Sequence, residues 1–321
     1  MTQPLNGEGT KADTVTLEIV CHIAFITINR PKALNALNEA IVERLAYKFA
    51  EAEKNSSVKA IVLRGAGKVF VAGADIRFFI EKIQAGAVTD IEAFASRCHD
   101  VFLKIENSRK QTIALLDGLS LGGGSELALA CNAILATPAG SLGFPETGIG
   151  IYPGLGGMLR LAKKVGGPLA KYYVLTGASM NAGDAEALGI VTRLVDQTGV
   201  DAALDSMINQ GRVDKYAPRV LPTRFKPFER AFSPDNLQRM LAGQPPVDVP
   251  EETAEKILKA LKHKAPLALL AASEIIDGQV RVSIEEGIAL ELGRMQEMFL
   301  TADAFEGISS AGKKHPEFKG K

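Results

Sequence analysis

Two carboxylates and a run of glycines, gathered within residues 117–157, form the part of this chain best suited to chemistry. Glu126 follows Gly122-Gly123-Gly124-Ser125, and Glu146 comes twenty residues later, directly after Pro145. Eleven of the 31 glycines fall in this region. A glycine run that opens an apolar helix exposes backbone N–H groups, which could hold an oxygen that becomes negative. Backbone donors beside paired carboxylates indicate general acid/base work on a carbonyl substrate.

Each of these features also has an ordinary structural interpretation. Three glycines can simply make a tight turn. Glu126 could serve the dipole of the helix that it opens, an interaction worth about 0.3–1 kcal/mol. Its neighbours at 127–130 are apolar, so we expect its carboxylate to be partly buried, which would raise its pKa and suit a general acid. Glu146, taken alone, is typical of a solvated loop carboxylate.

Ala72-Gly73-Ala74-Asp75 is a second segment that could contact a reacting oxygen. It follows the apolar residues 69–71, and Asp75 could cap a helix that begins at Ile76. If Ala74 lay opposite Gly123, their N–H groups could bind one oxygen together. Sequence spacing does not establish that meeting, and alone the segment is an ordinary loop.

Other kinds of site have little support. The histidines, at positions 22, 99, 263 and 315, are scattered and show neither a nucleophile arrangement nor zinc spacing. No GxxxxGK[ST] phosphate loop is present. The segment Gly154-Leu155-Gly156-Gly157 lacks the strand context and the ribose-binding acid of a dinucleotide fingerprint. A hydrolytic triad or a metal site is therefore a weak hypothesis.

Composition bounds the class of protein. The 321 residues are 46% hydrophobic, which suits one large domain with an appended segment. The 37 basic and 37 acidic residues balance, which argues against nucleic acid or an anionic membrane surface as a partner. No apolar run reaches about 18 residues, so no transmembrane helix is expected. Three cysteines without metal-ligand spacing, and no apolar signal core at the start, favour a cytoplasmic location.

The hydrophobic pattern predicts strands and helices in alternation. Residues 16–20 and 23–28 suggest a hairpin, and Asn38 could cap an amphipathic helix that runs to about residue 54. A second amphipathic helix is expected through residues 91–105, and another from about Gly124. Further short strands are expected at 60–63, 112–116, 133–136 and 190–195. This order favours an α/β fold with largely parallel pairing.

The chain changes character after about residue 196. Seven of its 15 prolines lie between positions 218 and 250, and residues 219–234 are basic, aromatic and irregular. We interpret residues 201–250 as an inserted, proline-rich loop region. From residue 251 the pattern is helical, with helices expected at 251–263, 267–277 and 283–300 and a basic tail after them.

Four ordered blocks resemble the crotonase (enoyl-CoA hydratase/isomerase) superfamily, and most closely its enoyl-CoA hydratases. The blocks are 29–37 (NRPKALNAL), 72–76 (AGADI), 117–131 (DGLSLGGGSELALAC) and 144–157 (FPETGIGIYPGLGG). The resemblance covers roughly residues 13–196 well and the C-terminal helices loosely. It implies an α/β fold, a crotonase-like spiral of ββα units with a helical C-terminal region, assembled as a homotrimer or a dimer of trimers.

The resemblance also implies roles by position. Ala74 and Gly123 would supply the N–H groups of an oxyanion hole for an acyl-CoA thioester oxygen. Glu126 and Glu146 would be the catalytic glutamates, which hold a water between them and move its proton. Residues implied to contact the substrate or its CoA are Lys32, Ala33, Leu34, Ala72, Asp75, Ile76, Arg77 and Gly122. No metal and no cofactor are implied, because coenzyme A is part of the substrate.

The activity implied is reversible syn addition of water to a 2-enoyl-CoA thioester, since relatives that isomerise or hydrolyse tend to lack one of the two glutamates. Isomerisation and 3-hydroxyacyl-CoA hydrolysis remain alternatives, and the segment from about residue 210 to 250, with the helices after it, is similar to the longer tails of the hydrolases. A non-catalytic acyl-CoA- or RNA-binding assembly protein is an alternative of a different class. It is motivated only by the basic residues 219–230 and the basic tail, and such runs are more often solvated surface.

The expected organisation has four parts. A flexible tail at residues 1–13 precedes a ββα core at 14–200, the insertion at 201–250 and a helical trimerisation region at 251–321. We expect an acyl-CoA substrate and further copies of this chain as partners, and neither nucleic acid nor a membrane. The length and branching of the acyl group, the direction of the reaction and the pathway stay open.

Overall fold

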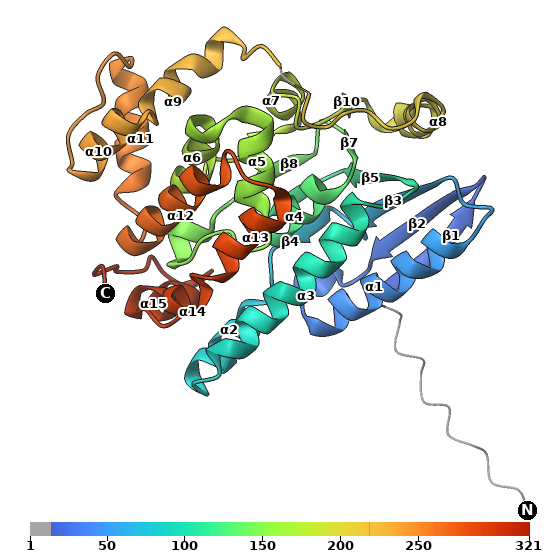
Figure 1. Ribbon diagram of the computed structural model, residues 1–321, viewed down its shortest axis with the longest axis horizontal. Coiled ribbons are helices and arrows are strands. Elements are labelled where there is room, and N and C mark those ends of the chain that lie inside the picture. Colours follow the sequence, from blue (N-terminus) through green and yellow to red (C-terminus); the bar gives the residue numbers. More distant parts are fainter. Residues whose placement is uncertain (1–13, 218) are drawn as a thin grey trace, which may run out of the picture.

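Two sheets form the framework of the fold (Figure 1). The structure, a computed structural model, describes residues 14–217 and 219–321, so the tail expected at residues 1–13 lies outside the described residues. The strands of the larger sheet, in spatial order, are β1 (Val15–Val20), β2 (Ile23–Ile28), β3 (Ala60–Gly65), β5 (Gln111–Leu116), β7 (Ala133–Ala136) and β10 (Arg193–Leu194). The smaller sheet consists of β4 (Val69–Ala72), β6 (Leu119–Leu121), β8 (Ser141–Gly143) and β9 (Met180–Asn181).

Strand pairing is largely parallel, as the sequence predicts. The β1–β2 hairpin is antiparallel, whereas β2, β3, β5 and β7 pair in parallel. Ile61, Val62 and Leu63 are all at most 1% exposed, which is typical of a parallel strand covered on both faces. The strands β3, β5 and β7 are each followed by a short parallel strand of the smaller sheet and then by helix. This repeat is the spiral of ββα units that the family resemblance implies.

Capping residues start the early helices where the sequence predicts. Asn38 accepts the backbone N–H of Ile41 and begins α1 (Glu39–Lys54). Asp75 accepts the N–H of Arg77 and begins α2 (Ile76–Gln84), and α3 (Val88–Glu106) follows. Helices α1 and α3 run beside each other along the larger sheet (Figure 1). The next helix, α4 (Gly123–Ala130), is buried along its whole length, so its N-terminus lies inside the molecule.

The segment after residue 200 is more ordered than expected. It contains α8 (Val200–Gln210), α9 (Lys226–Ala231) and α10 (Pro234–Leu241), so the prediction of irregular structure over residues 219–234 is wrong. Prolines lie in the first turn of α9 and of α10, where a missing N–H breaks no hydrogen bond. Phe228 stacks on Tyr172 of α6 (Gly167–Thr176), with 4.4 Å between ring centroids. The aromatic residues of this segment therefore anchor it to the core.

The C-terminal region is helical, as predicted. Its helices are α11 (Glu251–Leu261), α12 (Pro266–Gln279), α13 (Ile284–Leu292), α14 (Met295–Phe299) and α15 (Ala302–Ser310). The prediction of a single helix over residues 283–300 is wrong, because the helix is interrupted between Leu292 and Met295 and forms α13 and α14 instead. The last residues are not a free tail, since the N–H groups of Lys319 and Gly320 donate to the Asp303 carboxylate.

The strand expected over residues 190–195 is much shorter than predicted, because only Arg193 and Leu194 pair with β7.

Within the described ranges, no helix combines the length and the apolar composition that a bilayer crossing requires.

Candidate active site

A cavity of about 220 Å³ opens at the N-terminus of α4. Both candidate glutamates line it, together with most of the residues that the sequence singles out. The lining residues predicted from sequence are Ala72, Ala74, Ile76, Gly122, Gly123, Glu126 and Glu146. The remaining walls come from α2, α3, the residues before α5 (Gly157–Val165) and α14. Residues from distant parts of the chain therefore meet at one place.

The peptide groups before Ala74 and Gly123 both border this cavity. The carbonyl of Gly73 accepts the N–H of Leu37 at 2.9 Å, and the carbonyl of Gly122 accepts the N–H of Glu126 at 3.0 Å. In a trans peptide the N–H points away from the C=O, so the N–H groups of Ala74 and Gly123 face the opposite side. A Cβ built on Gly123 would lie 3.7 Å from the carbonyl carbon of Gly73. The two peptide groups therefore lie close to each other, and an oxyanion hole needs such a pair of neighbouring N–H donors.

Two of the glycines before Glu126, Gly122 and Gly124, have no room for a side chain, each because of a different neighbour. Gly122 has a φ of +47°, and a Cβ there would lie 2.3 Å from Oε1 of Glu146. A Cβ on Gly124 would lie 2.0 Å from the carbonyl oxygen of Val71, at the end of β4. Only glycine therefore allows the helix to approach both the carboxylate and the neighbouring strand.

Glu126 is 1% exposed, which confirms the expected burial. Its Oε1 accepts the backbone N–H groups of Leu155 and Gly157, each at 2.8 Å. Burial raises the pKa of Glu126 to about 7, although the two N–H groups and the charge of Arg160 act in the opposite direction. The carboxylate is thus poised to change protonation state near neutral pH.

Glu146 is also buried, unlike the solvated carboxylate that its loop sequence suggests when taken alone. Burial raises its pKa well above the usual range, and the negative charge of Glu126 adds to the rise. The charge of Lys264, which lies between α11 and α12, acts in the opposite direction. Oε2 of Glu146 has no hydrogen-bond partner among the described residues. A buried acceptor without a partner is a group that a ligand can satisfy.

Residues 32–34, which are expected to contact CoA, lie beside the cavity and not in its wall. Leu34 is 54% exposed, and its carbonyl accepts the N–H of Ala72 at 3.0 Å. Lys32 is exposed and Ala33 half-buried on the short 3-10 turn before it. The hydrogen bond to Leu34 joins residues 32–34 to the segment that begins at Ala72, beside the cavity. Contact of either segment with CoA stays a prediction.

Asp75 and Arg77 also lie outside the cavity lining. Oδ2 of Asp75 pairs with Arg30 at 2.9 Å and with Arg77 at 3.1 Å. The hydrogen bond from Arg77 is the main cause that lowers the pKa of Asp75. Asp75 therefore fixes the start of α2 and the turn at residue 30, whereas Arg77 is exposed.

Comparison with known proteins places the chain in a family. Residues 23–319 match the family model described as enoyl-CoA hydratase/isomerase. The chain belongs to this family. Its members' shared name implies an enzyme with an acyl-CoA substrate.

Full-length relatives agree with this membership. A probable enoyl-CoA hydratase of Rhizobium meliloti is 30% identical over 308 residues, which cover 96% of this chain and 98% of the relative. The 2,3-dehydroadipyl-CoA hydratase of Escherichia coli is 28% identical, covering 93% of this chain and 96% of that protein. A crystal structure of an enoyl-CoA hydratase from Rhodobacter sphaeroides matches with a TM-score of 0.80 and 28% identity, over 94% of this chain and 89% of that one. The crotonase fold is thereby confirmed.

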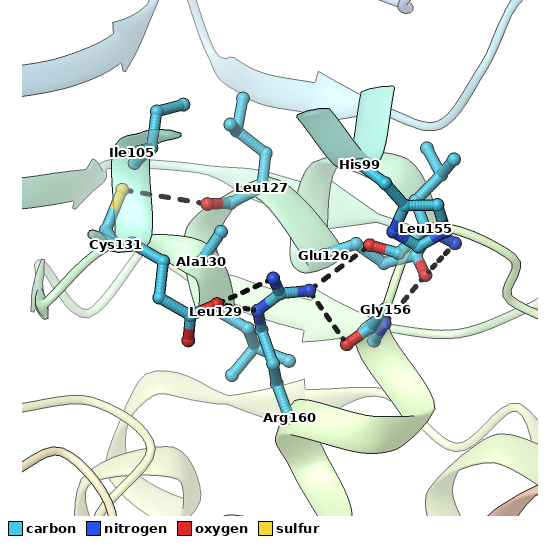
Figure 2. Close-up of polar contacts among 12 residues, drawn as sticks. His99, Ile105, Glu126, Leu127, Leu129, Ala130, Cys131, Leu155, Gly156 and Arg160 are labelled. Atoms are coloured by element: carbon cyan, nitrogen blue, oxygen red, sulfur yellow. Dashed lines mark hydrogen bonds and ion pairs between the residues drawn. The ribbon is translucent and has the colours of Figure 1, made fainter. Parts of the chain in front are cut away.

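A layer of buried polar residues behind Glu126 was not found from the sequence (Figure 2). Arg160 is fully buried, and its guanidinium donates to the carbonyls of Leu155 and Gly156 and to Glu106. His99 bonds through Nε2 to the carbonyl of Gly154 at 3.0 Å. One signal was available, because an arginine in the apolar run at 158–162 needs a buried partner.

The same layer reaches the segment after residue 200. Lys215 pairs with Glu106 at 2.6 Å, and the hydroxyl of Tyr216 donates to the same carboxylate oxygen at 2.9 Å. Among the described residues, no group of three or more His, Cys, Asp or Glu is arranged to hold a metal ion.

Proposed function

We propose that this protein is an enoyl-CoA hydratase, which adds water reversibly to the double bond of a 2-enoyl-CoA thioester. The observation that carries the proposal is that two buried carboxylates line one cavity together with Ala74 and Gly123, whose preceding carbonyls are already hydrogen-bonded elsewhere. The N–H groups of Ala74 and Gly123 would hold the thioester oxygen as it gains negative charge. One such donor is worth about 2.7–4 kcal/mol of barrier lowering.

The environments of the two glutamates suggest their roles. Glu126 accepts two N–H groups, which stabilise its ionised form, so we assign it as the base that takes a proton from water. Burial and the negative charge of Glu126 raise the pKa of Glu146 well above the usual range. We therefore assign Glu146 as the acid. The burial of Glu126 by itself favours the acid role expected from sequence, but its two donors favour the base.

The proposed step balances with one water. The water oxygen bonds to Cβ while Glu126 takes one water proton, and Glu146 gives its proton to Cα on the same face. Electrons of the double bond move through the enolate, whose oxygen lies in the oxyanion hole. Proton transfer from Glu126 to Glu146 then restores the starting pair. Positioned acid/base groups of this kind add roughly 10²–10⁴ in rate.

The cavity favours an apolar acyl group. Beyond the two glutamates its side chains are aliphatic or aromatic, including Phe79, Phe94 and Phe299, and no Lys, Arg or His of the described residues lines it. The hydroxyl of Tyr152 is occupied, since it donates to the carbonyl of Glu291 at 2.6 Å. A substrate with a terminal carboxylate, such as that named for the Escherichia coli relative, would meet no cation among the described residues that line the cavity.

A test of the acid role is Glu146→Gln, which keeps the shape of the side chain but cannot donate a proton to carbon. We expect turnover of crotonyl-CoA to fall by about 10²–10⁴, while calorimetry shows that acyl-CoA still binds. The exposed Glu252→Gln is the matched control and should retain full activity. Retained activity in Glu146→Gln would remove the role assigned to this residue.

A substrate panel separates this proposal from its alternatives. Loss of the conjugated enoyl-thioester absorbance indicates hydration, and release of free CoA indicates a thioester hydrolase. A shifted double bond without water addition indicates an isomerase. If no substrate reacts but acyl-CoA or RNA binds, the protein has a binding role. Light scattering on the same samples tests the expected homotrimer or dimer of trimers.

A further inference from the structure

A third buried glutamate lies behind the proposed base. Glu291 of α13 is 0% exposed, and its Oε2 accepts the backbone N–H of Gly156 at 2.7 Å. The residues on either side, Leu155 and Gly157, donate their N–H groups to Glu126. Successive peptides of one loop are thus held by two carboxylates, alternately from α13 and from α4. A shift of the Gly156 peptide would move both donors of Glu126.

The position of Glu291 is itself fixed from several sides. Its Oε1 accepts the side-chain N–H of Gln279 in α12 at 2.8 Å, and its backbone carbonyl accepts the hydroxyl of Tyr152 at 2.6 Å. A capping box between Ser283 and Glu286 sets the start of α13. Both partners of the Glu291 carboxylate are donors, so an amide at this position could satisfy only one of them.

Other charged or titratable groups also face this carboxylate. His99 of α3 lies with Nε2 at 3.8 Å from Oε2 of Glu291, but that nitrogen donates to the carbonyl of Gly154. Burial lowers the pKa of His99 to about 3, so the ring is neutral. Arg160 holds the carbonyl side of the same loop (Figure 2). Burial raises the pKa of Glu291 to about 8, and the charge of Glu126 adds to the rise.

We propose that Glu291 is a positioning residue, which fixes the Gly156 peptide so that the N–H groups of Leu155 and Gly157 point at Glu126. The inference rests on the proposed hydratase function, because it concerns the base of that reaction. It gives the C-terminal region a direct part in setting the proton affinity of a residue in the ββα core.

The test is the pH profile of Glu291→Gln. Misaligned donors would stabilise the ionised form of Glu126 less, so the pKa of Glu126 would rise. The acid limb of the profile is the fall in kcat/KM at low pH, where Glu126 becomes protonated. We expect this limb to shift to higher pH by about one unit. At pH 7 kcat should then fall roughly five- to tenfold, with KM changed less than about threefold. Gln279→Met removes the donor that orients Glu291, together with the hydrogen bond from Gln279 to the carbonyl of Gly287, and should give a smaller shift in the same direction.

Asp303→Asn is the matched control. Asp303 is another buried carboxylate of the C-terminal region that accepts two backbone N–H groups, but these belong to Lys319 and Gly320 and not to the loop that binds Glu126. We expect it to lower the melting temperature without moving the acid limb. A folded Glu291→Gln protein with an unchanged limb would overturn the proposal. A limb that moves to lower pH would also overturn it, because Glu291 would then act only through its charge.

A second readout separates this inference from the proposed function. Carbon-13 NMR of labelled glutamate carboxyls, with Glu126→Gln to assign the signal, measures the pKa of Glu126 without any substrate. If the wild-type protein is inactive on every enoyl-CoA, the hydratase proposal fails. The Glu126 titration with and without Glu291→Gln would still show whether Glu291 positions that loop, and an unmoved titration would reject it.

Discussion

At the scale of single residues, Glu126 and Glu146 carry the same side chain but meet different surroundings. Glu126 accepts two peptide N–H groups, whereas Oε2 of Glu146 has no partner among the described residues. Hydrogen bonds to a carboxylate favour its ionised form, and burial without them favours the protonated form. Above the Glu126 pKa of about 7, and until Glu146 also loses its proton, the pair therefore holds one proton, which is what an acid and a base acting together require.

The first prediction at this scale is a fall in activity below neutral pH. A base must be ionised, and the pKa of Glu126 is raised to about 7. Lowering the pH through 7 protonates it, so kcat/KM should drop roughly tenfold for each further pH unit. Initial rates of hydration from pH 5 to 9 would measure this, with circular dichroism to verify folding. A flat profile from pH 5 to 8 would contradict it.

At the scale of elements, the turn into α4 sets how closely that helix approaches the carboxylate of Glu146. Gly122→Ala would place a methyl group 2.3 Å from Oε1 of Glu146. We expect turnover to fall by about 10² or more, as a misplacement of about 1 Å at a reacting centre can cause. Gly166→Ala is the control, since it has a φ of +83° but no atom within 4 Å of the added Cβ. Equal losses of activity in both variants would mean that backbone strain, not the clash, is the cause.

The other end of α4 depends on the segment after residue 200. Nζ of Lys215 approaches the carbonyls of Leu129 and Ala130, at 3.1 and 3.3 Å, and also pairs with Glu106. Lys215→Met would leave these buried acceptors with fewer donors, so we expect it to lower the free energy of unfolding by about 3 kcal/mol. Urea titration would measure this, with the exposed Lys226→Met changing stability by less than about 0.5 kcal/mol. A loss below about 1 kcal/mol would show that the segment does not support α4.

At the scale of the whole molecule, the cavity exists because the C-terminal helices close over the ββα core. Phe299 of α14 packs against Phe79 of α2, with 5.1 Å between ring centroids, and both line the cavity. The acyl group proposed to bind there would therefore contact both the ββα core and the C-terminal helices.

Phe299→Ala should enlarge this cavity and change the acyl preference. We expect the ratio of kcat/KM for a ten-carbon over a four-carbon enoyl-CoA to rise about tenfold, the range typical of altered apolar pockets. Leu300→Ala, at a neighbouring side chain that is 69% exposed, serves as the control. An unchanged ratio in Phe299→Ala would place the acyl end elsewhere.

The sequence by itself determined what depends on local chemistry. The capping by Asn38 and Asp75, the hairpin and the apolar parallel strands follow from short-range propensity and periodicity, and the structure has them. The four family blocks identified the fold. The same reasoning failed over residues 219–234, where buried aromatic side chains and prolines at helix starts outweighed a loop-like composition.

Only the tertiary structure decided which polar groups meet. Glu291 lies 165 positions after Glu126, yet both bind one loop, and Lys215 reaches a helix 85 residues before it. Besides Arg160 in its apolar run, the sequence signal was a glutamate on the buried face of α13, three residues after Ile288. Such a residue indicates that a buried partner must exist, because an unpaired buried charge is costly. It does not name the partner, since pairing across the fold depends on how helices pack and not on spacing along the chain.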